Sequence, residues 1–143
     1  MKKYKIGYTQ GTYDMFHIGH LNLLRNAKSQ CEKLIVGINS NALVMKYKNK
    51  YPVIDEKSRA EIVKELKSVD DVILCDTLSK TFIWNMIHFN AIFIGDDWKG
   101  NARWNQTEKD LAALGAKVVY LPHTDGICST LLRAQEKERI KER

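Results

Sequence analysis

The chain has 143 residues, of which 44% are hydrophobic and 28% are charged, and its formal net charge is +6. These values are ordinary for one globular domain, and we expect a single domain over residues 1–143. No apolar run approaches the roughly 18 residues of a membrane span, and no apolar segment closely follows the N-terminal lysines, so we expect a cytoplasmic protein that is not exported and has no membrane contact. The three cysteines are far apart and lack metal-ligand spacing, which predicts reduced thiols.

The first informative segment of the chain is residues 6–27, IGYTQGTYDMFHIGHLNLLRNA. Ile6–Thr9 is short and apolar, which predicts a strand, and Leu21, Leu24 and Ala27 recur at helical spacing. A strand therefore leads through a glycine turn into an amphipathic helix.

Two histidines, His17 and His20, lie where this helix is predicted to begin. Gly19 permits close approach of a ligand to the backbone, and the free N–H groups of a helix start favour an anion such as phosphate. As hydrogen-bond donors, the two imidazoles can stabilise the charge that develops in phosphoryl transfer. A zinc site and a purely structural histidine pair are the alternative interpretations.

The rest of the chain alternates strands and helices. Further strands are predicted at 33–39, 72–75, 91–94 and 117–121, and helices at 55–66, 81–89, 107–114 and from Ser129 onward. An apolar stripe of Ile83, Met86 and Ile87 predicts the buried face of one helix. This alternation predicts an α/β fold, a Rossmann-like, doubly wound parallel sheet of five strands with helices on both faces.

A basic segment follows the second predicted strand. Lys46, Lys48 and Lys50 are interleaved with Tyr47 and Tyr51, and we interpret the segment as a loop that clamps a phosphorylated substrate. The alternative is an exposed basic loop without a ligand. Much of the remaining positive charge lies in the tail KERIKER, whose alternating sign is typical of a solvated helix end. We therefore expect no nucleic-acid partner.

Two more polar clusters follow predicted strands. In GDDW, one of Asp96 and Asp97 is a candidate acceptor for a hydroxyl or holds magnesium through water, and Trp98 is a candidate to pack over a ligand. In HTDGICST, Ser129 or Thr130 is placed to cap the last helix beside the phosphate region. Ligands of parallel sheets bind outside the carboxyl ends of the strands, so all these clusters predict one active site.

In this order and at these separations, GTYDMFHIGH, the lysine segment, Arg59, IGDDW and HTDGICST resemble the cytidylyltransferase family, and are most similar to bacterial glycerol-3-phosphate cytidylyltransferases. The resemblance implies transfer of CMP from CTP to a small phosphorylated alcohol, with Mg²⁺ on the triphosphate. Glycerol 3-phosphate is the first expected acceptor, and CDP-glycerol for a teichoic-acid-like or capsular polymer is the expected product. The family resemblance also implies a homodimer with a contact near Lys67–Asp71.

The resemblance assigns roles to individual residues. It places transfer chemistry on His17, His20, Lys46 and Lys48. It implies that the substrate is bound by Lys46, Lys48, Arg59, Asp97 and Trp98. It implies that the nucleotide is bound by Tyr8, Thr9, Gly11, Thr12, Tyr13, His17, Gly19, His20, Asp96, His123, Thr124, Gly126, Ser129 and Thr130.

The last motif departs from the family pattern R-T-E-G-I-S-T-T. His123 stands in the place of its arginine, and a neutral histidine lacks the bidentate donor fork of arginine. Two alternatives therefore stand beside CMP transfer to glycerol 3-phosphate. One is adenylyl transfer, or cytidylyl transfer to another phosphorylated alcohol. The other is a regulatory module that binds a nucleotide without turnover.

Overall fold

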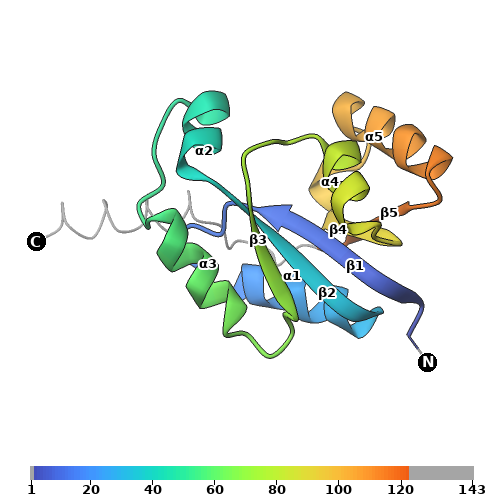
Figure 1. The fold of residues 1–143 in the computed structure, drawn as a ribbon, viewed down its shortest axis with the longest axis horizontal. Coiled ribbons are helices and arrows are strands. Elements are labelled where there is room, and N and C mark those ends of the chain that lie inside the picture. The colour runs from blue at the N-terminus through green and yellow to red at the C-terminus, as the bar shows by residue number, and fades with distance from the viewer. Residues whose placement is uncertain (1, 123–143) are drawn as a thin grey trace, which may run out of the picture.

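The fold is that of a computed structural model, which describes residues 2–122. It contains one parallel sheet of five strands in the order β3-β2-β1-β4-β5 (Figure 1). Its elements are β1 (Tyr4–Gly11), α1 (Ile18–Ser29), β2 (Cys31–Asn39), α2 (Asn41–Lys48), α3 (Glu56–Lys64), β3 (Asp71–Cys75), α4 (Lys80–Ile87), β4 (Ala91–Gly95), the short 3₁₀ helix η1 (Asp96–Trp98), α5 (Ala102–Ala113) and β5 (Lys117–Leu121). The predicted Rossmann-like α/β fold is confirmed.

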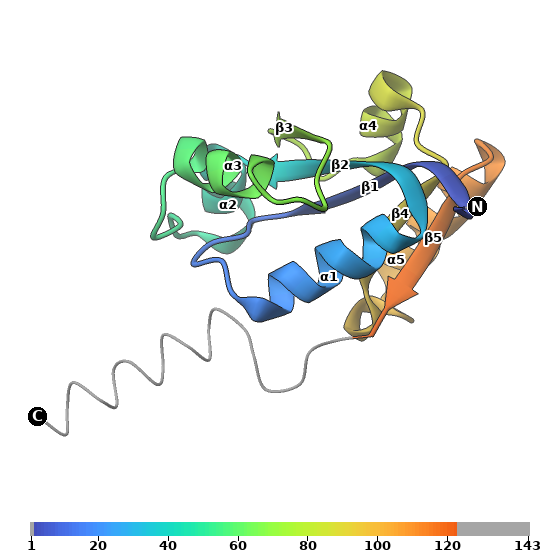
Figure 2. The same ribbon diagram turned by 90° about the horizontal axis from the view of Figure 1, so that it is seen from below.

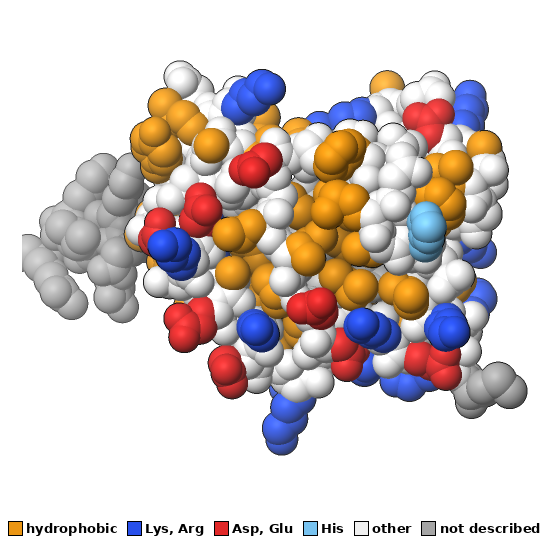
Figure 3. Space-filling model, in the orientation of Figure 1, with side chains coloured by type: hydrophobic (Ala, Val, Ile, Leu, Met, Phe, Trp, Pro, Cys, Tyr) orange, Lys and Arg blue, Asp and Glu red, His pale blue; other side chains and the backbone are white. Residues whose placement is uncertain are grey.

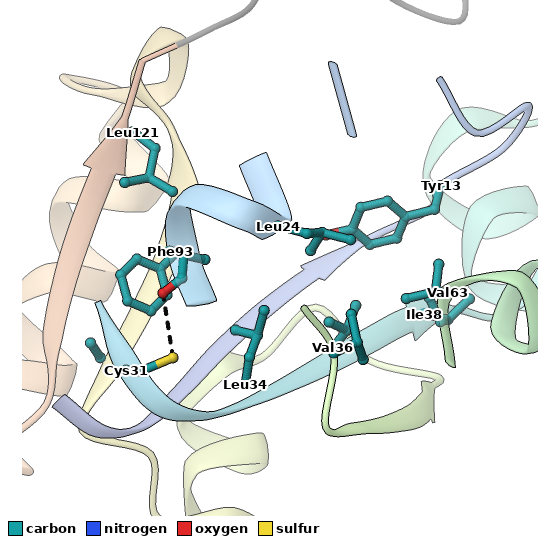
Figure 4. Close-up of a cluster of buried hydrophobic side chains, with 12 residues drawn as sticks. Tyr13, Leu24, Cys31, Leu34, Val36, Ile38, Val63, Phe93 and Leu121 are labelled. Carbon is teal, nitrogen blue, oxygen red and sulfur yellow. Dashed lines mark hydrogen bonds between the residues drawn. The ribbon is translucent and has the colours of Figure 1, made fainter. Parts of the chain in front are cut away.

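Each face of the sheet carries its own hydrophobic core. Strand β2 shows why, because successive side chains of a strand point to opposite faces. Leu34 and Val36 pack with Leu24 of α1 and Val63 of α3, whereas Ile35 packs in the second core. Figure 2 shows α1 and α4 on opposite sides of the sheet, and Figure 4 shows the first core, in which side chains of β2 lie beside Leu24 of α1 and Val63 of α3. The apolar segments that form the strands are therefore buried on both faces of the sheet.

Two helices differ from their predictions. Helix α2 lies where a loop was predicted, because the Ser40 side chain accepts from the backbone N–H of Leu43 and caps the helix. Leu43 and Val44 are buried and anchor it. Helix α5 begins at Ala102 rather than at Thr107, because the side chain of Asn101 caps it.

The predicted apolar stripe of α4 is wrong at one position. Ile83 is buried, but the side chain of Met86 is 61% exposed. Figure 3 shows hydrophobic side chains gathered on the face between α3 and α4, over the edge strand β3, and the large exposed hydrophobic residues include Leu74 and Phe82. A helix in contact with the sheet on one side only leaves such residues at the surface.

Gly37 of β2 leaves room for a polar contact between a side chain of β1 and a side chain of β3, the two strands that flank β2. The Tyr8 hydroxyl and Cys75 Sγ form a buried hydrogen bond of 3.3 Å beside it. A Cβ at Gly37 would lie 2.1 Å from Oη of Tyr8 and 2.8 Å from Sγ of Cys75. Burial raises the pKa of the Tyr8 hydroxyl above its ordinary range, so this hydroxyl stays protonated. The absence of a side chain at Gly37 is thus a packing requirement.

Cys31 and Cys75 are buried free cysteines, as predicted, and Cys128 lies outside the described residues. Over residues 2–122, no helix is long and apolar enough to cross a membrane.

We expect Gly37→Ala to destabilise the protein by roughly 2–3 kcal/mol, because a methyl group in a filled space forces its neighbours to shift. Gly115→Ala is the matched control: its Cβ would meet nothing within 4 Å, and only its φ of +85° is unfavourable, at about 1 kcal/mol. Urea unfolding of both variants measures the difference. Equal midpoints for Gly37→Ala and the wild type would contradict the packing account.

Candidate active site

A pocket of about 640 Å³ opens at the carboxyl edge of the sheet. It lies between the ends of β1 and β4. Strands β2 and β3 are added on one side of β1, and β4 and β5 on the other, and ligands of open parallel sheets usually bind where the strand order reverses in this way. Its lining includes eight of the predicted site residues: Thr9, Gly11, Thr12, Tyr13, His20, Lys48, Asp97 and Trp98. Three of the four predicted clusters, the histidine motif, the lysine segment and GDDW, therefore meet here, and the fourth, HTDGICST, lies outside the described residues.

The two histidines form one rigid unit at the start of α1. The backbone N–H of Gly19 donates to Nδ1 of His17 at 3.1 Å, and the backbone N–H of His17 donates to Nδ1 of His20 at 3.2 Å. The two rings stack with centroids 3.8 Å apart. Because both Nδ1 atoms accept, each neutral ring carries its proton on Nε2 and is a donor there.

Burial, as the largest cause, and the neighbouring His17 together lower the pKa of His20 to about 4, against an opposing effect of Asp14. His20 is therefore neutral near pH 7. A neutral imidazole can donate to a phosphoryl oxygen, but it cannot neutralise that oxygen's charge. The cations must come from other residues.

The loop between β1 and α1 is held in an uncommon conformation. Tyr13 has a φ of 54° and Met15 a φ of 49°, in the left-handed region that side chains seldom adopt. Burial of the Tyr13 ring and the side chain of Asp14 offset this strain. The Asp14 carboxylate accepts from the backbone N–H groups of Val53 and Ile54 at 2.8 and 2.9 Å.

Arg59 is buried rather than directed into the pocket. Its side chain is 1% exposed and donates to the carbonyl oxygens of Thr12, Asn39 and Ile54 at 2.7, 2.8 and 2.8 Å. A fourth hydrogen bond reaches Oδ1 of Asn41 at 2.8 Å. These partners come from the segments that follow β1 and β2 and precede α3. This placement corrects the expectation of a substrate contact: Arg59 joins the walls of the site.

The predicted lysines separate on α2. Lys48 lines the pocket, with Nζ 5.6 Å from the centre of the Tyr47 ring. Lys46 is exposed and is not among the lining residues. Because α2 is a helix, residues two apart point in different directions, so one of the pair faces the pocket.

The pocket residues that were not predicted include Lys80, Asn101, Arg103 and Trp104. Lys80 donates from Nζ to the carbonyl of Leu78 at 2.9 Å and lies 5.6 Å from the Trp104 ring. Arg103 lies over Trp98 at 5.7 Å, and Asn101 completes this wall. Burial, together with the nearby charge of Arg103, lowers the pKa of Lys80 to about 8. These cations come from α4 and α5, and no sequence motif marks them.

The remaining predicted residues lie elsewhere. Tyr8 is fully buried and is not among the lining residues, and its hydroxyl donates to Oε1 of Gln10 at 2.7 Å, so its side chain supports the pocket floor from the core. Gly19 lies in the first turn of α1, and Asp96 is exposed in η1 beside the pocket-lining Asp97. His123, Thr124, Gly126, Ser129 and Thr130 lie outside the described residues.

Comparison with known proteins agrees with this geometry. A family model described as cytidylyltransferase-like matches residues 8–135. The relatives include two proteins named "Bifunctional protein HldE". That of Nitrobacter hamburgensis is 32% identical over 129 residues, and that of Rhodopseudomonas palustris is 33% identical over 132 residues. The matches cover 90% and 92% of this chain but 26% of each relative, so the chain spans about a quarter of their length.

Two solved structures share the fold. A lipopolysaccharide core biosynthesis protein from Thermoplasma volcanium superposes with a TM-score of 0.70 at 24% identity, over 85% of this chain and 97% of that one. A pantoate-beta-alanine ligase from Francisella tularensis gives a TM-score of 0.63 at 18% identity, over 96% of this chain and 70% of that one. At these identities the likeness concerns architecture alone.

We expect Arg59→Lys to destabilise the protein by roughly 3 kcal/mol, because a lysine leaves buried carbonyl groups without donors. Lys64→Met, at an exposed position of the same helix, should change stability by less than about 0.5 kcal/mol. Denaturant unfolding measures both. If Arg59→Lys had wild-type stability but lost substrate binding, the expected direct contact between Arg59 and the substrate would be supported instead.

The lowered pKa of His20 predicts a loss of stability in acid. The unfolded state binds the proton near pH 6.5 and the folded state near pH 4, so the contribution is complete above pH 6.5 and disappears as the pH falls to 4. We expect an NMR titration midpoint for His20 near 4, and a flatter stability profile between pH 6.5 and 4 in His20→Gln. A midpoint at 6.5 or higher would contradict this.

Proposed function

The chain belongs to the cytidylyltransferase-like family and is a nucleotidyltransferase, and we propose that it transfers AMP from ATP to a phosphorylated sugar. The products are an ADP-sugar and pyrophosphate. The observation that carries the proposal is His20 at the start of α1, which lines the pocket together with Lys48, Lys80 and Arg103 and whose Nδ1 accepts from the backbone N–H of His17. The ring of His17 stacks on that of His20 but does not itself line the pocket.

The reaction forms one phosphorus–oxygen bond and breaks another. A phosphate oxygen of the sugar attacks the α-phosphorus of ATP, and the bond from that phosphorus to the pyrophosphate oxygen breaks. Negative charge grows on the oxygens of the phosphoryl group that is being transferred, and the Nε2–H groups of His17 and His20 stabilise this charge. Lys48, Lys80 and Arg103 hold the phosphates in place. No covalent enzyme intermediate is needed.

The relatives named HldE favour ATP and a sugar phosphate over CTP and glycerol 3-phosphate. The comparisons support the cytidylyltransferase-like family but not the expected similarity to glycerol-3-phosphate cytidylyltransferases, since the relatives are named HldE. The pocket supports the larger acceptor, since about 640 Å³ is within the usual range for whole small molecules. Its lining includes the hydroxyl groups of Thr12 and Tyr47, which are of the kind that recognise sugars.

Magnesium remains part of the proposal. Among residues 2–122, no group of three or more histidine, cysteine or acidic side chains is arranged to hold a metal ion. This fits Mg²⁺, which keeps several waters and is held mainly by substrate phosphates with one or two carboxylates. Asp97, which lines the pocket, is the carboxylate that we assign to it. The ion would neutralise the leaving pyrophosphate.

The cytoplasmic location and the homodimer also remain proposals. Asp70, in the segment implied for the dimer contact, pairs with Lys28 at 2.6 Å and accepts from the backbone N–H of Leu34 at 2.7 Å within the same chain. The adjoining strand β3 is an edge strand with exposed apolar neighbours, a surface suited to a second copy.

The test is a panel of Mg²⁺, each nucleoside triphosphate, and phosphorylated sugars and alcohols, with pyrophosphate release as the readout. We expect release with ATP and a sugar phosphate. Release with CTP and glycerol 3-phosphate alone would overturn the proposed substrates, and no release with any pair would favour a regulatory module.

His17→Ala and His20→Ala should each lower turnover by roughly a hundredfold, the scale for losing a preorganised donor. His88→Asn is the matched control, because His88 is exposed outside the pocket and asparagine tolerates its φ of 50°. Wild-type turnover in either alanine variant would remove that histidine from the chemistry.

A further inference from the structure

The lysine-bearing end of α2 is weakly anchored by packing. A helix of eight residues is unstable on its own in water, and in α2 only Leu43 and Val44, in its first turn, are buried. Tyr47 and Lys48, in its last turn, are exposed yet line the pocket. The position of this last turn therefore depends on polar contacts.

Those contacts form a triangle at the tip of Tyr47. Its hydroxyl lies 3.1 Å from Oγ1 of Thr12, and Nδ2 of Asn39 donates to both hydroxyl oxygens at 3.2 Å. All three residues line the pocket. The triangle joins α2 to the segments that follow β1 and β2.

The triangle leaves one hydroxyl proton without an acceptor among its own three side chains. The amide nitrogen of Asn39 has two protons and gives one to each hydroxyl. The two hydroxyls have one proton each, and the contact between them uses one of these. One hydroxyl proton remains, and within the triangle no acceptor is left for it. The pair therefore offers one O–H donor to an oxygen of a bound ligand.

Asn39 is fixed from the core, which fixes the triangle. Its side-chain oxygen accepts from Nε2 of Gln10 at 2.9 Å, and its backbone carbonyl accepts from Arg59 at 2.8 Å. Nε2 of Gln10 also donates to the carbonyl of Thr77 at 2.9 Å, and its Oε1 accepts from Tyr8. The amide orientations are thus set by the protein, and the ligand meets a preorganised floor.

We infer that Tyr47 is a positioning residue of the transfer site. Its hydroxyl holds the end of α2 that carries Lys48 against Thr12 and Asn39, and together with Thr12 it presents one donor to a ligand oxygen. The inference rests on the proposed function for its kinetic consequence, but the fixing of α2 is independent of which substrates are used.

The kinetic test compares Tyr47→Phe with Tyr51→Phe. Tyr47→Phe removes only the hydroxyl and keeps the ring beside Lys48, and Tyr51 is a nearby tyrosine that is 67% exposed. We expect Tyr47→Phe to raise the KM of the phosphorylated acceptor or of the triphosphate about tenfold, the effect of losing a hydrogen bond, with kcat changed less than about threefold. Tyr51→Phe should match the wild type. Equal kinetics for all three proteins would overturn the inference.

A double-mutant cycle tests whether Tyr47 acts through Thr12. In Thr12→Val combined with Tyr47→Phe, the loss in kcat/KM should be about that of the more damaging single variant, because both single variants break the same contact. Multiplied losses would show that the two hydroxyls act independently and would overturn the positioning role.

Hydrogen exchange gives a readout without activity. We expect the amides of residues 45–49 to exchange about fivefold faster in Tyr47→Phe than in the wild type, and at the wild-type rate in Tyr51→Phe. If no substrate pair reacts with the wild type, the proposed function fails while this measurement still decides the inference. Unchanged exchange in Tyr47→Phe would overturn it.

Discussion

The carboxyl edge of the sheet depends on the buried guanidinium of Arg59. It donates to backbone carbonyls at Asn39, the last residue of β2, and at Thr12 and Ile54, which lie in the loops after β1 and before α3. Burial lowers the pKa of Arg59, whereas the nearby carboxylate of Asp14 raises it, so the acidic group helps to keep the cation charged in the interior. Asp14 in turn holds the backbone beside Ile54. Removing the cation would leave buried carbonyl groups without donors.

This framework explains a division of labour in the pocket. His20 is neutral and contributes a directed N–H donor, because burial and the neighbouring His17 disfavour a proton on its ring. Positive charge comes from the surrounding helices, through Lys48 of α2, Lys80 of α4 and Arg103 of α5. A transfer reaction needs both fixed donors and mobile or adaptable cations around the phosphates. The scaffold supplies them from different layers of the fold.

The sequence predicted the elements whose signals are local. Five apolar runs predicted five parallel strands, and the histidine pair was correctly placed at the start of α1. Burial partners could not be read in the same way. An arginine that binds phosphate and one that binds buried carbonyls look alike in a sequence, so the placement of Arg59 was missed. Lys80 and Arg103 were missed because they approach the pocket only through the packing of α4 and α5, although Ser40 before α2 and Asn101 before α5 were capping signals that could have been used.

The central proposal is that ATP binds in the pocket at the carboxyl edge of the sheet, between the ends of β1 and β4. Its most direct test is amide chemical-shift mapping of the intact protein titrated with ATP and Mg²⁺. The account predicts the largest shifts at Thr12, His20, Lys48 and Asp97, with small shifts along β3 and α3. Large shifts confined to β3 and α3, with none at the histidines, would contradict it.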